Sequence, residues 1–152
     1  MDIKLDIHAK YKDTSVTVHT PSWTKEIESL LNQLQAQTNT KKLAGVLRDQ
    51  TILLDPNEVD YVYAEARKVF AVFDGESIEL NMKLYDAERL LTSYRFTRFS
   101  KSVIGNVNRL ERFELSFNGN LCVFFSSGAK EYVSRKYVKE MKQQLLMEVE
   151  DR

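Results

Sequence analysis

The chain has 152 residues, of which 43% are apolar, and its 22 Lys and Arg side chains balance 22 Asp and Glu side chains. This length fits one domain, or one domain with a sizeable N-terminal addition. Because the longest apolar runs span only a few residues and the start lacks a signal-peptide core, the sequence excludes a membrane-spanning protein and predicts a cytoplasmic one.

The first 45 residues are expected to form a small β-β-α segment. Apolar and polar residues alternate over residues 3–7 and 15–19, as in half-buried strands. Thr20 and Pro21 are typical of a helix start, and the predicted helix carries an apolar stripe of Ile27, Leu30, Leu31 and Leu34. Residues 35–42 lack apolar periodicity and are the predicted linker. The segment is too small to be stable alone, so we expect it either to pack on the β domain or to pair with its copy in a second chain. We favour the homodimer contact, with regulation as the alternative role.

Residues 46–152 are predicted to form a mainly β domain with inserted helices. One helix is expected after Asn81 and a last one near Ser134. Their apolar stripes are Leu84, Ala87, Leu90 and Leu91, and then Val138, Met141 and Leu145. The predicted strands are residues 52–54, 59–64, 68–73, 77–80, 96–99, 107–112, 113–117, 121–125 and 131–133. This order lacks the strict alternation of a parallel α/β sheet and favours antiparallel sheets.

Two dipeptides, Asp74-Gly75 and Asn118-Gly119, predict tight hairpins, because both central residues of a type I′ turn need positive φ. A two-residue turn at Asn118-Gly119 would place Cys122 opposite Leu115, on the face that carries Phe113 and Phe117. We expect Cys122 to be a small core residue and not a nucleophile, since no histidine lies nearby in sequence to activate it.

The sequence contains no constellation typical of an enzyme. Its five glycines are isolated and form no phosphate-binding loop. A single cysteine excludes an internal disulfide and a Cys-based metal cluster, and His8 and His19 are not spaced as metal ligands. The acids around Pro56 are interpreted as a polar turn between strands. We therefore expect no enzymatic activity, no cofactor and no metal.

The cations are unevenly distributed along the chain. Residues 61–140 contain 13 Lys and Arg against 10 Asp and Glu, whereas residues 1–60 contain 7 against 9. This mild excess permits phosphate contacts without requiring them. Three basic clusters lie where predicted strands or helices begin or end, positions from which side chains project outward. They are Arg67-Lys68, residues 95–102 and Ser134-Arg135-Lys136-Tyr137.

Within residues 95–102, Arg98, Ser100, Lys101 and Ser102 can donate to phosphates or base edges, whereas Phe96 and Phe99 are expected to pack in the core. At the last helix, cations at the N-terminus cost about a few tenths of a kcal/mol each. An external phosphate would reverse that balance, because free backbone N–H groups and both cations would face one anion. The alternative is that Arg135 and Lys136 are solvated.

Residues 60–145 resemble the LytTR family of bacterial DNA-binding domains. The matching stretches are residues 57–65, Asp74-Gly75 with the helix over 84–91, residues 95–107 and residues 133–140. The resemblance implies an elongated arrangement of small antiparallel β-sheets with short helices. It also implies loops that enter successive major grooves of double-stranded DNA, commonly with members bound in pairs at promoter repeats.

The resemblance therefore implies a sequence-specific transcription regulator, and its positions coincide with the three basic clusters. We expect base reading by Arg67, Lys101 and Lys136, with Ser100 on the same surface. Phosphate contacts are expected from Lys68, Arg98, Ser102, Arg135 and Tyr137. Other members often have histidine or asparagine where this chain has Arg67, Ser100 and Lys101, and Arg and Lys favour guanine or phosphate.

About 45 residues precede the predicted domain, too few for the receiver domain that most members carry. Stand-alone regulators of this kind resemble those paired with a small membrane protein, which makes such a protein a predicted partner. The competing hypothesis is a protein–protein interaction module whose basic loops are solvated. Such a module would not bind duplex DNA even at low salt.

Overall fold

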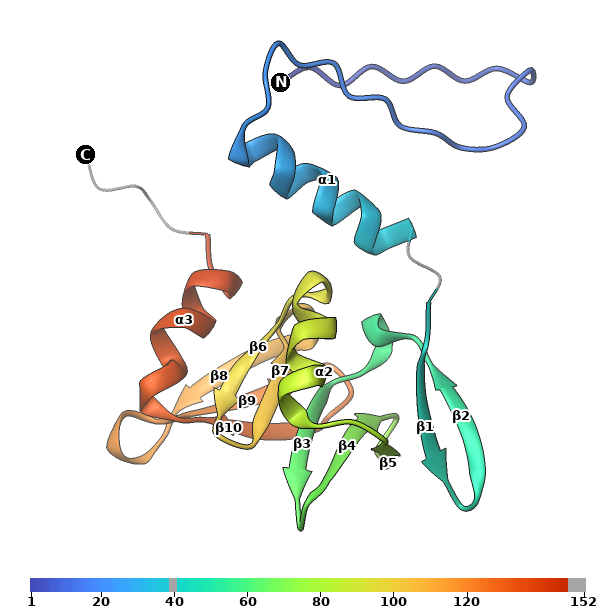
Figure 1. Cartoon of the computed structure of the whole chain (residues 1–152). Coiled ribbons are helices and arrows are strands. Elements are labelled where there is room, and N and C mark those ends of the chain that lie inside the picture. The colour runs from blue at the N-terminus through green and yellow to red at the C-terminus, as the bar shows by residue number, and fades with distance from the viewer. Residues whose placement is uncertain (39–40, 148–152) are drawn as a thin grey trace.

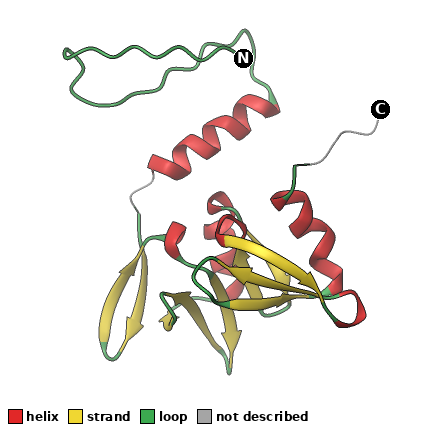
Figure 2. Cartoon of the chain, turned by 180° about the vertical axis from the view of Figure 1, so that it is seen from behind, coloured by secondary structure: helices red, strands yellow, loops and turns green. Residues whose placement is uncertain are grey.

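The computed structural model describes residues 1–38 and 41–147, which form an N-terminal arm, a helix and a β-rich domain (Figures 1 and 2). The helices are α1 (Lys25–Thr38), α2 (Leu84–Leu91) and α3 (Arg135–Leu145). The strands are β1 (Leu43–Leu47), β2 (Gln50–Leu54), β3 (Tyr61–Glu65), β4 (Lys68–Phe73), β5 (Glu76–Leu80), β6 (Phe96–Ser100), β7 (Val103–Asn106), β8 (Leu110–Leu115), β9 (Leu121–Phe125) and β10 (Lys130–Val133). The predicted fold class, mainly β with short helices, is confirmed.

The larger sheet contains seven of the described strands, all antiparallel, in the order β2-β1-β5-β4-β3-β7-β6. Helix α2 covers it with the buried side chains of Ala87 and Leu91, which pack in one core with Val62 and Ile78 of the strands. Leu90, which was expected on this apolar stripe, is exposed instead. The eight-residue helix therefore buries a narrower face than its sequence predicted.

The smaller sheet has the order β10-β9-β8 and builds a second core with helix α3. Val123 and Phe125 of β9 pack there with Phe99 of β6 and Met141 of α3. Val138 and Leu145 pack against the same cluster. The apolar stripe predicted for the last helix is therefore confirmed, and α3 is attached to β6 as well as to the smaller sheet.

A buried carboxylate joins the two sheets. Asp60 accepts hydrogen bonds from Arg109 Nε and from Ser127 Oγ, each at 2.7 Å. Its backbone N–H donates to the Val72 carbonyl, and its own carbonyl accepts from the Asn106 N–H, both at 2.9 Å. Because Arg109 and Ser127 flank the β8–β9 hairpin, Asp60 holds the smaller sheet against β3 and β4 of the larger one.

A close approach between β6 and β7 fixes the position of Phe99, near the end of β6. The register shifts between Arg98 and Ser100, so Phe99 lies at a β-bulge. A Cβ on Gly105 would lie only 2.1 Å from the Phe99 ring, and this ring is fully buried against Phe125, with a centroid distance of 6.4 Å. Only glycine permits this contact. Phe96 is also buried, so the prediction that both phenylalanines are core residues is confirmed.

The N-terminal arm differs from its prediction. Residues 3–7 and 15–19 are extended, but neither segment belongs to a β-ladder, so the two predicted strands are not formed. Alternation requires a neighbouring strand with which to pair, and the backbone of residues 3–7 makes no hydrogen bond to the backbone of any described residue. Helix α1 begins at Lys25 and not after Thr20, because the Thr24 hydroxyl accepts the Ile27 N–H at 3.2 Å.

Helix α1 also continues to Thr38, into the predicted linker, of which residues 39 and 40 lie outside the described residues. Strand β1 was not predicted, and it spans the expected domain boundary after residue 45. Strand β7 was also missed. Of residues 107–117, predicted as two strands, Val107–Arg109 form a 3₁₀ turn, Leu110–Leu115 form the single strand β8, and Phe117 begins a second 3₁₀ turn.

The hairpin between β8 and β9 has a longer loop than predicted. The loop spans residues 116–120 and is closed by the Ser116 N–H, which donates to the Asn120 carbonyl at 2.8 Å. Cys122 therefore pairs with Glu114, not with Leu115. Leu115 and Phe117 are exposed, so the predicted shared core face is wrong, although Cys122 itself is buried as expected.

Glu131 of β10 gives a testable pH dependence. Burial raises the pKa of its carboxyl above the ordinary value, and the Tyr132 N–H, which donates to it at 3.0 Å, opposes this shift. A raised folded-state pKa means that stability falls as pH rises between the unfolded and folded pKa values. We expect Glu131→Gln to raise the melting temperature at pH 7 and to have no effect below the ordinary carboxyl pKa. Thermal unfolding of the wild type and the variant, at pH 7 and at a pH below the ordinary carboxyl pKa, checks this. An equal change in melting temperature at the two pH values would contradict it.

Candidate nucleic-acid interface

The turn between β3 and β4 presents Arg67 to solvent. Glu65 pairs with Lys68, so Ala66 and Arg67 form a two-residue turn. Both have positive φ, 50° and 67°, as in a type I′ turn, although neither is glycine. Lys68 forms an exposed ion pair with Glu79 at 3.7 Å, which is a weak interaction. Arg67 makes no ion pair to any described residue and remains available to a ligand.

The strain in this turn can be measured. A non-glycine residue in the left-handed region costs about 1–2 kcal/mol, part of which glycine recovers. We expect Ala66→Gly to raise the free energy of unfolding by about 0.5–1 kcal/mol. Ala64→Gly, in β3, is the matched control and should lower it. Chemical denaturation compares the two variants, and equal effects would show that the turn stores no strain.

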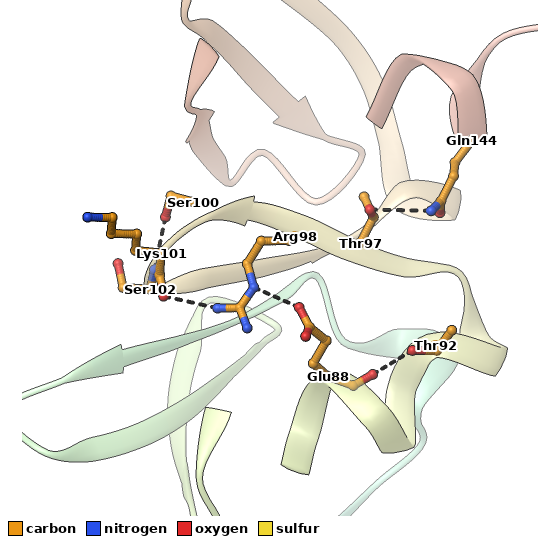
Figure 3. A network of polar contacts seen from close by, with 8 residues as sticks. All are labelled: Glu88, Thr92, Thr97, Arg98, Ser100, Lys101, Ser102 and Gln144. Carbon is orange, nitrogen blue, oxygen red and sulfur yellow. Dashed lines mark hydrogen bonds and ion pairs between the residues drawn. The ribbon is translucent and has the colours of Figure 1, made fainter. Parts of the chain in front are cut away.

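The turn between β6 and β7 presents Lys101 and Ser102. Ser100 pairs with Val103, and the two residues between them are exposed. The Ser100 hydroxyl accepts the Ser102 N–H at 3.3 Å, which closes the turn locally. Figure 3 shows the Lys101 side chain pointing away from the polar network behind it. Its ammonium forms no ion pair within the described part of the chain.

Arg98 holds this turn from behind. Its Nε donates to Glu88 of α2 at 2.7 Å, and one terminal nitrogen donates to the Lys101 carbonyl at 3.0 Å (Figure 3). The Arg98 and Glu88 side chains are only 19% and 33% exposed, so the ion pair is partly shielded from water. The Arg98 guanidinium thus links α2 to the backbone of the exposed turn. Sequence reasoning selected Arg98 but missed Glu88, which lies ten residues away on a helix.

The start of α3 is attached to the loop between β8 and β9. The Arg135 N–H donates to Asn120 Oδ1 at 2.9 Å, and the Tyr137 N–H donates to the Ser134 carbonyl at 2.8 Å. The expectation that the first N–H groups of this helix are free for an anion is wrong for these two. The Arg135 side chain lies over Gly119, where an added Cβ would be 3.1 Å from Arg135 Cδ.

Lys136 keeps its charge at the surface. Its ammonium lies 5.4 Å from the centre of the Tyr137 ring, within the range of a cation–π contact. Tyr137 is half-buried and packs against the second core, which restricts its ring. Lys136 is therefore an exposed cation on a rigid support.

Backbone hydrogen bonds bring the three segments together. The Ala64 N–H, at the end of β3, donates to the Ser102 carbonyl at 2.8 Å. The Ser134 N–H, which precedes α3, donates to the Phe99 carbonyl of β6, also at 2.8 Å. The β3–β4 turn, the β6–β7 turn and the first turn of α3 thus follow one border of the domain (Figure 1). We call residues 66–68, 100–102 and 135–137 the basic edge.

A hollow of about 640 Å³ lies beside the basic edge, between α2, β6 and α3. Arg98, Lys101 and Tyr137 line it together with Glu88 and Glu140. The hollow is therefore lined by both signs of charge, and Lys101 is the cation that it shares with the exposed turns of the basic edge. Among residues 1–38 and 41–147, no three His, Cys, Asp or Glu side chains are grouped as metal ligands. No described helix has the length and apolar character needed to cross a bilayer.

Comparison with known proteins identifies the domain. The family model of the LytTr DNA-binding domain matches residues 49–146. A protein described as an uncharacterized HTH-type transcriptional regulator of Staphylococcus aureus strain MSSA476 is 26% identical over 145 residues, 95% of this chain and 98% of that protein. A protein of the same description from strain NCTC 8325 / PS 47 is 25% identical over the same shares.

A solved structure supports the same fold. A LytTr DNA-binding domain from Bacillus cereus matches with a TM-score of 0.64 and 20% identity, over 70% of this chain and 98% of that one. The resemblance noted in the sequence is thereby confirmed. Since the family model covers well over half of the residues, the chain belongs to the LytTR family of DNA-binding domain proteins.

Proposed function

We propose that the chain is a sequence-specific transcription regulator that binds promoter DNA through the basic edge. The observation that carries the proposal is the pair of backbone hydrogen bonds, Ala64 to Ser102 and Ser134 to Phe99, that aligns three exposed cation-bearing segments. Each segment contributes at least one cation without an ion pair among the described residues: Arg67, Lys101, and both Arg135 and Lys136. The action of such a regulator belongs in the cytoplasm, where bacterial DNA lies.

The proposed roles follow from how each side chain is held. Arg67, Lys101 and Lys136 are exposed, form no ion pair among the described residues, and are assigned to base edges in successive major grooves. Lys68, Ser102, Arg135 and Tyr137 lie beside them and are assigned to phosphates, as is Ser100 through its exposed turn. Arg98 is assigned to positioning the β6–β7 turn, because its guanidinium is already bonded to Glu88 and to Lys101.

The relatives are described as HTH-type regulators, but a recognition helix is a poor fit to this domain. A helix-turn-helix needs two helices joined by about 3–4 residues. In the described part of the chain, five strands lie between α2 and α3, and five lie between α1 and α2. DNA recognition by turns and by the first turn of α3 is therefore the better explanation. A regulatory membrane-protein partner remains a prediction that rests on the family resemblance alone.

The test starts with selection of duplexes from a random library by the full chain, followed by titration of the selected duplex. Lys136→Ala is expected to weaken binding by about 1–3 kcal/mol, roughly five- to 150-fold, and to relax the base preference at one position. Lys25→Ala, an exposed lysine of α1, is the matched control and should have no such effect.

Failure of the full chain to select any duplex, even at low salt, would overturn the proposal and favour the protein-interaction alternative. Unchanged affinity and unchanged preference in Lys136→Ala would remove the base-reading role of that residue. Binding of the selected duplex should also fall steeply with salt, because each phosphate contact releases a counterion.

A further inference from the structure

The N-terminal arm exposes an aliphatic row that the rest of the chain does not cover. Ile3, Leu5 and Ile7 are 87%, 84% and 83% exposed. Val16 and Val18, by contrast, line a groove against Ile27 and other apolar residues of α1, and no residue of 1–8 lines that groove. Ile3, Leu5 and Ile7 are therefore left without a partner in one copy of the chain.

The backbone of the same residues is also unpaired. No backbone N–H or C=O of residues 3–7 takes part in a backbone–backbone hydrogen bond within the described residues. Exposed aliphatic side chains in alternation, on an extended backbone with open edges, form a template for another strand. Residues 15–19 could pair with only one of the two backbone edges of residues 3–7, so the other edge stays open.

The charges of residues 2–8 determine which strand can pair with that open edge. In an antiparallel pair of two copies centred on Leu5, directly opposite residues have numbers that add to ten. The opposite pairs are then Asp2 with His8, Ile3 with Ile7, Lys4 with Asp6, and Leu5 with its own copy. One face of the pair is entirely aliphatic, and the other places an acid opposite a base at every position.

Other registers lack this match. A shift by one pair in either direction places Lys4 opposite Lys4, or Asp6 opposite Asp6, and like charges that face each other across strands are destabilising. A shift by a single residue places aliphatic side chains opposite charged ones and breaks the division of faces. In a two-fold contact every pair away from the axis occurs twice, so the register centred on Leu5 contains two Lys4–Asp6 pairs.

We propose that residues 2–8 form a two-fold antiparallel β contact with a second copy of the chain, centred on Leu5. Asp6 also accepts a hydrogen bond from the Tyr11 hydroxyl at 2.5 Å, which holds its carboxylate on the charged face. The contact joins two chains through their arms and leaves both basic edges exposed. It is separate from DNA binding and does not depend on the proposed function.

Charge reversal tests the register by sedimentation equilibrium of the full chain. Lys4→Glu and Asp6→Lys each create two like-charge pairs and are expected to raise the dimer dissociation constant by about tenfold or more. The double variant, Lys4→Glu with Asp6→Lys, restores opposite charges and should return the dimer to near its original strength. Tyr11→Phe is the control for loss of the internal hydrogen bond; because it leaves both charges in place, it should weaken the dimer much less than either charge reversal.

Cysteine cross-linking gives an independent measurement in a Cys122→Ala background. Leu5→Cys faces its own copy at a separation that permits a disulfide, so mild oxidation should yield a covalent dimer. Ile7→Cys faces Ile3 of the other chain and lies about 13 Å from its own copy, too far to cross-link. The proposal would be overturned if the full chain is monomeric or if the single charge variants have no effect on the dimer. It would also be overturned if the double variant does not restore the dimer, or if both cysteine positions cross-link equally.

Discussion

The Asp60→Ala variant is expected to lose about 3 kcal/mol of unfolding free energy, at the lower end of the range for breaking a buried ion pair. Asp60 is buried, whereas its partner Arg109 is 30% exposed, so part of the cost is relieved by water at the guanidinium. The change also leaves Ser127 Oγ without its acceptor. For a chain of this length the melting temperature should fall by roughly 10 °C.

A double-mutant cycle separates the ion pair from the loss of packing. Arg109→Met removes the cation and retains the aliphatic stem, so Asp60→Ala combined with Arg109→Met should be less destabilised than the sum of the single variants. Denaturant titration of the four proteins gives the coupling. A loss below about 1 kcal/mol in Asp60→Ala would show that the sheets are held together mainly by the apolar cores.

The basic edge was predictable from sequence because it depends on residues at element ends. Arg67, Lys101 and Lys136 lie at turns or at the first turn of a helix. Each follows a predicted strand or begins a predicted helix, although the strand after Lys101, β7, was missed. What the sequence did not contain is the alignment of the three segments. That alignment depends on β3 pairing with β7 and on α3 docking on β6, which are long-range contacts.

The missed strands have physical explanations. Strand β1, Leu43–Leu47, follows a polar stretch and contains Gly45, which is disfavoured in strands on intrinsic grounds. Gly45 is required there because an added Cβ would lie 2.4 Å from Ile78 Cγ2. The N-terminal strands were predicted from alternation that is present in the sequence. They are not formed in the single chain because alternation specifies a face and not the strand that pairs with it.

The role of Arg98 could not be derived from its position in a basic cluster, since its partners come from α2 and from the turn itself. A phosphate contact and a positioning role predict different results. If Arg98 positions the β6–β7 turn, Arg98→Ala should weaken binding of the selected duplex by about tenfold or more without changing the dependence of affinity on salt. If it contacts a phosphate, the slope of log affinity against log salt should fall by about 0.9.

Glu88→Ala sharpens the distinction. It removes an acid near the basic edge and releases the guanidinium, so a direct phosphate contact by Arg98 predicts unchanged or tighter binding. Positioning through the 2.7 Å ion pair predicts weaker binding instead, because the link between α2 and the Lys101 turn is lost. Asp86→Ala removes an exposed acid from the same helix and is the matched control, with binding unchanged or slightly tighter. Weaker binding in Glu88→Ala alone, at an unchanged salt slope, would establish that Arg98 acts on DNA through the shape of the turn.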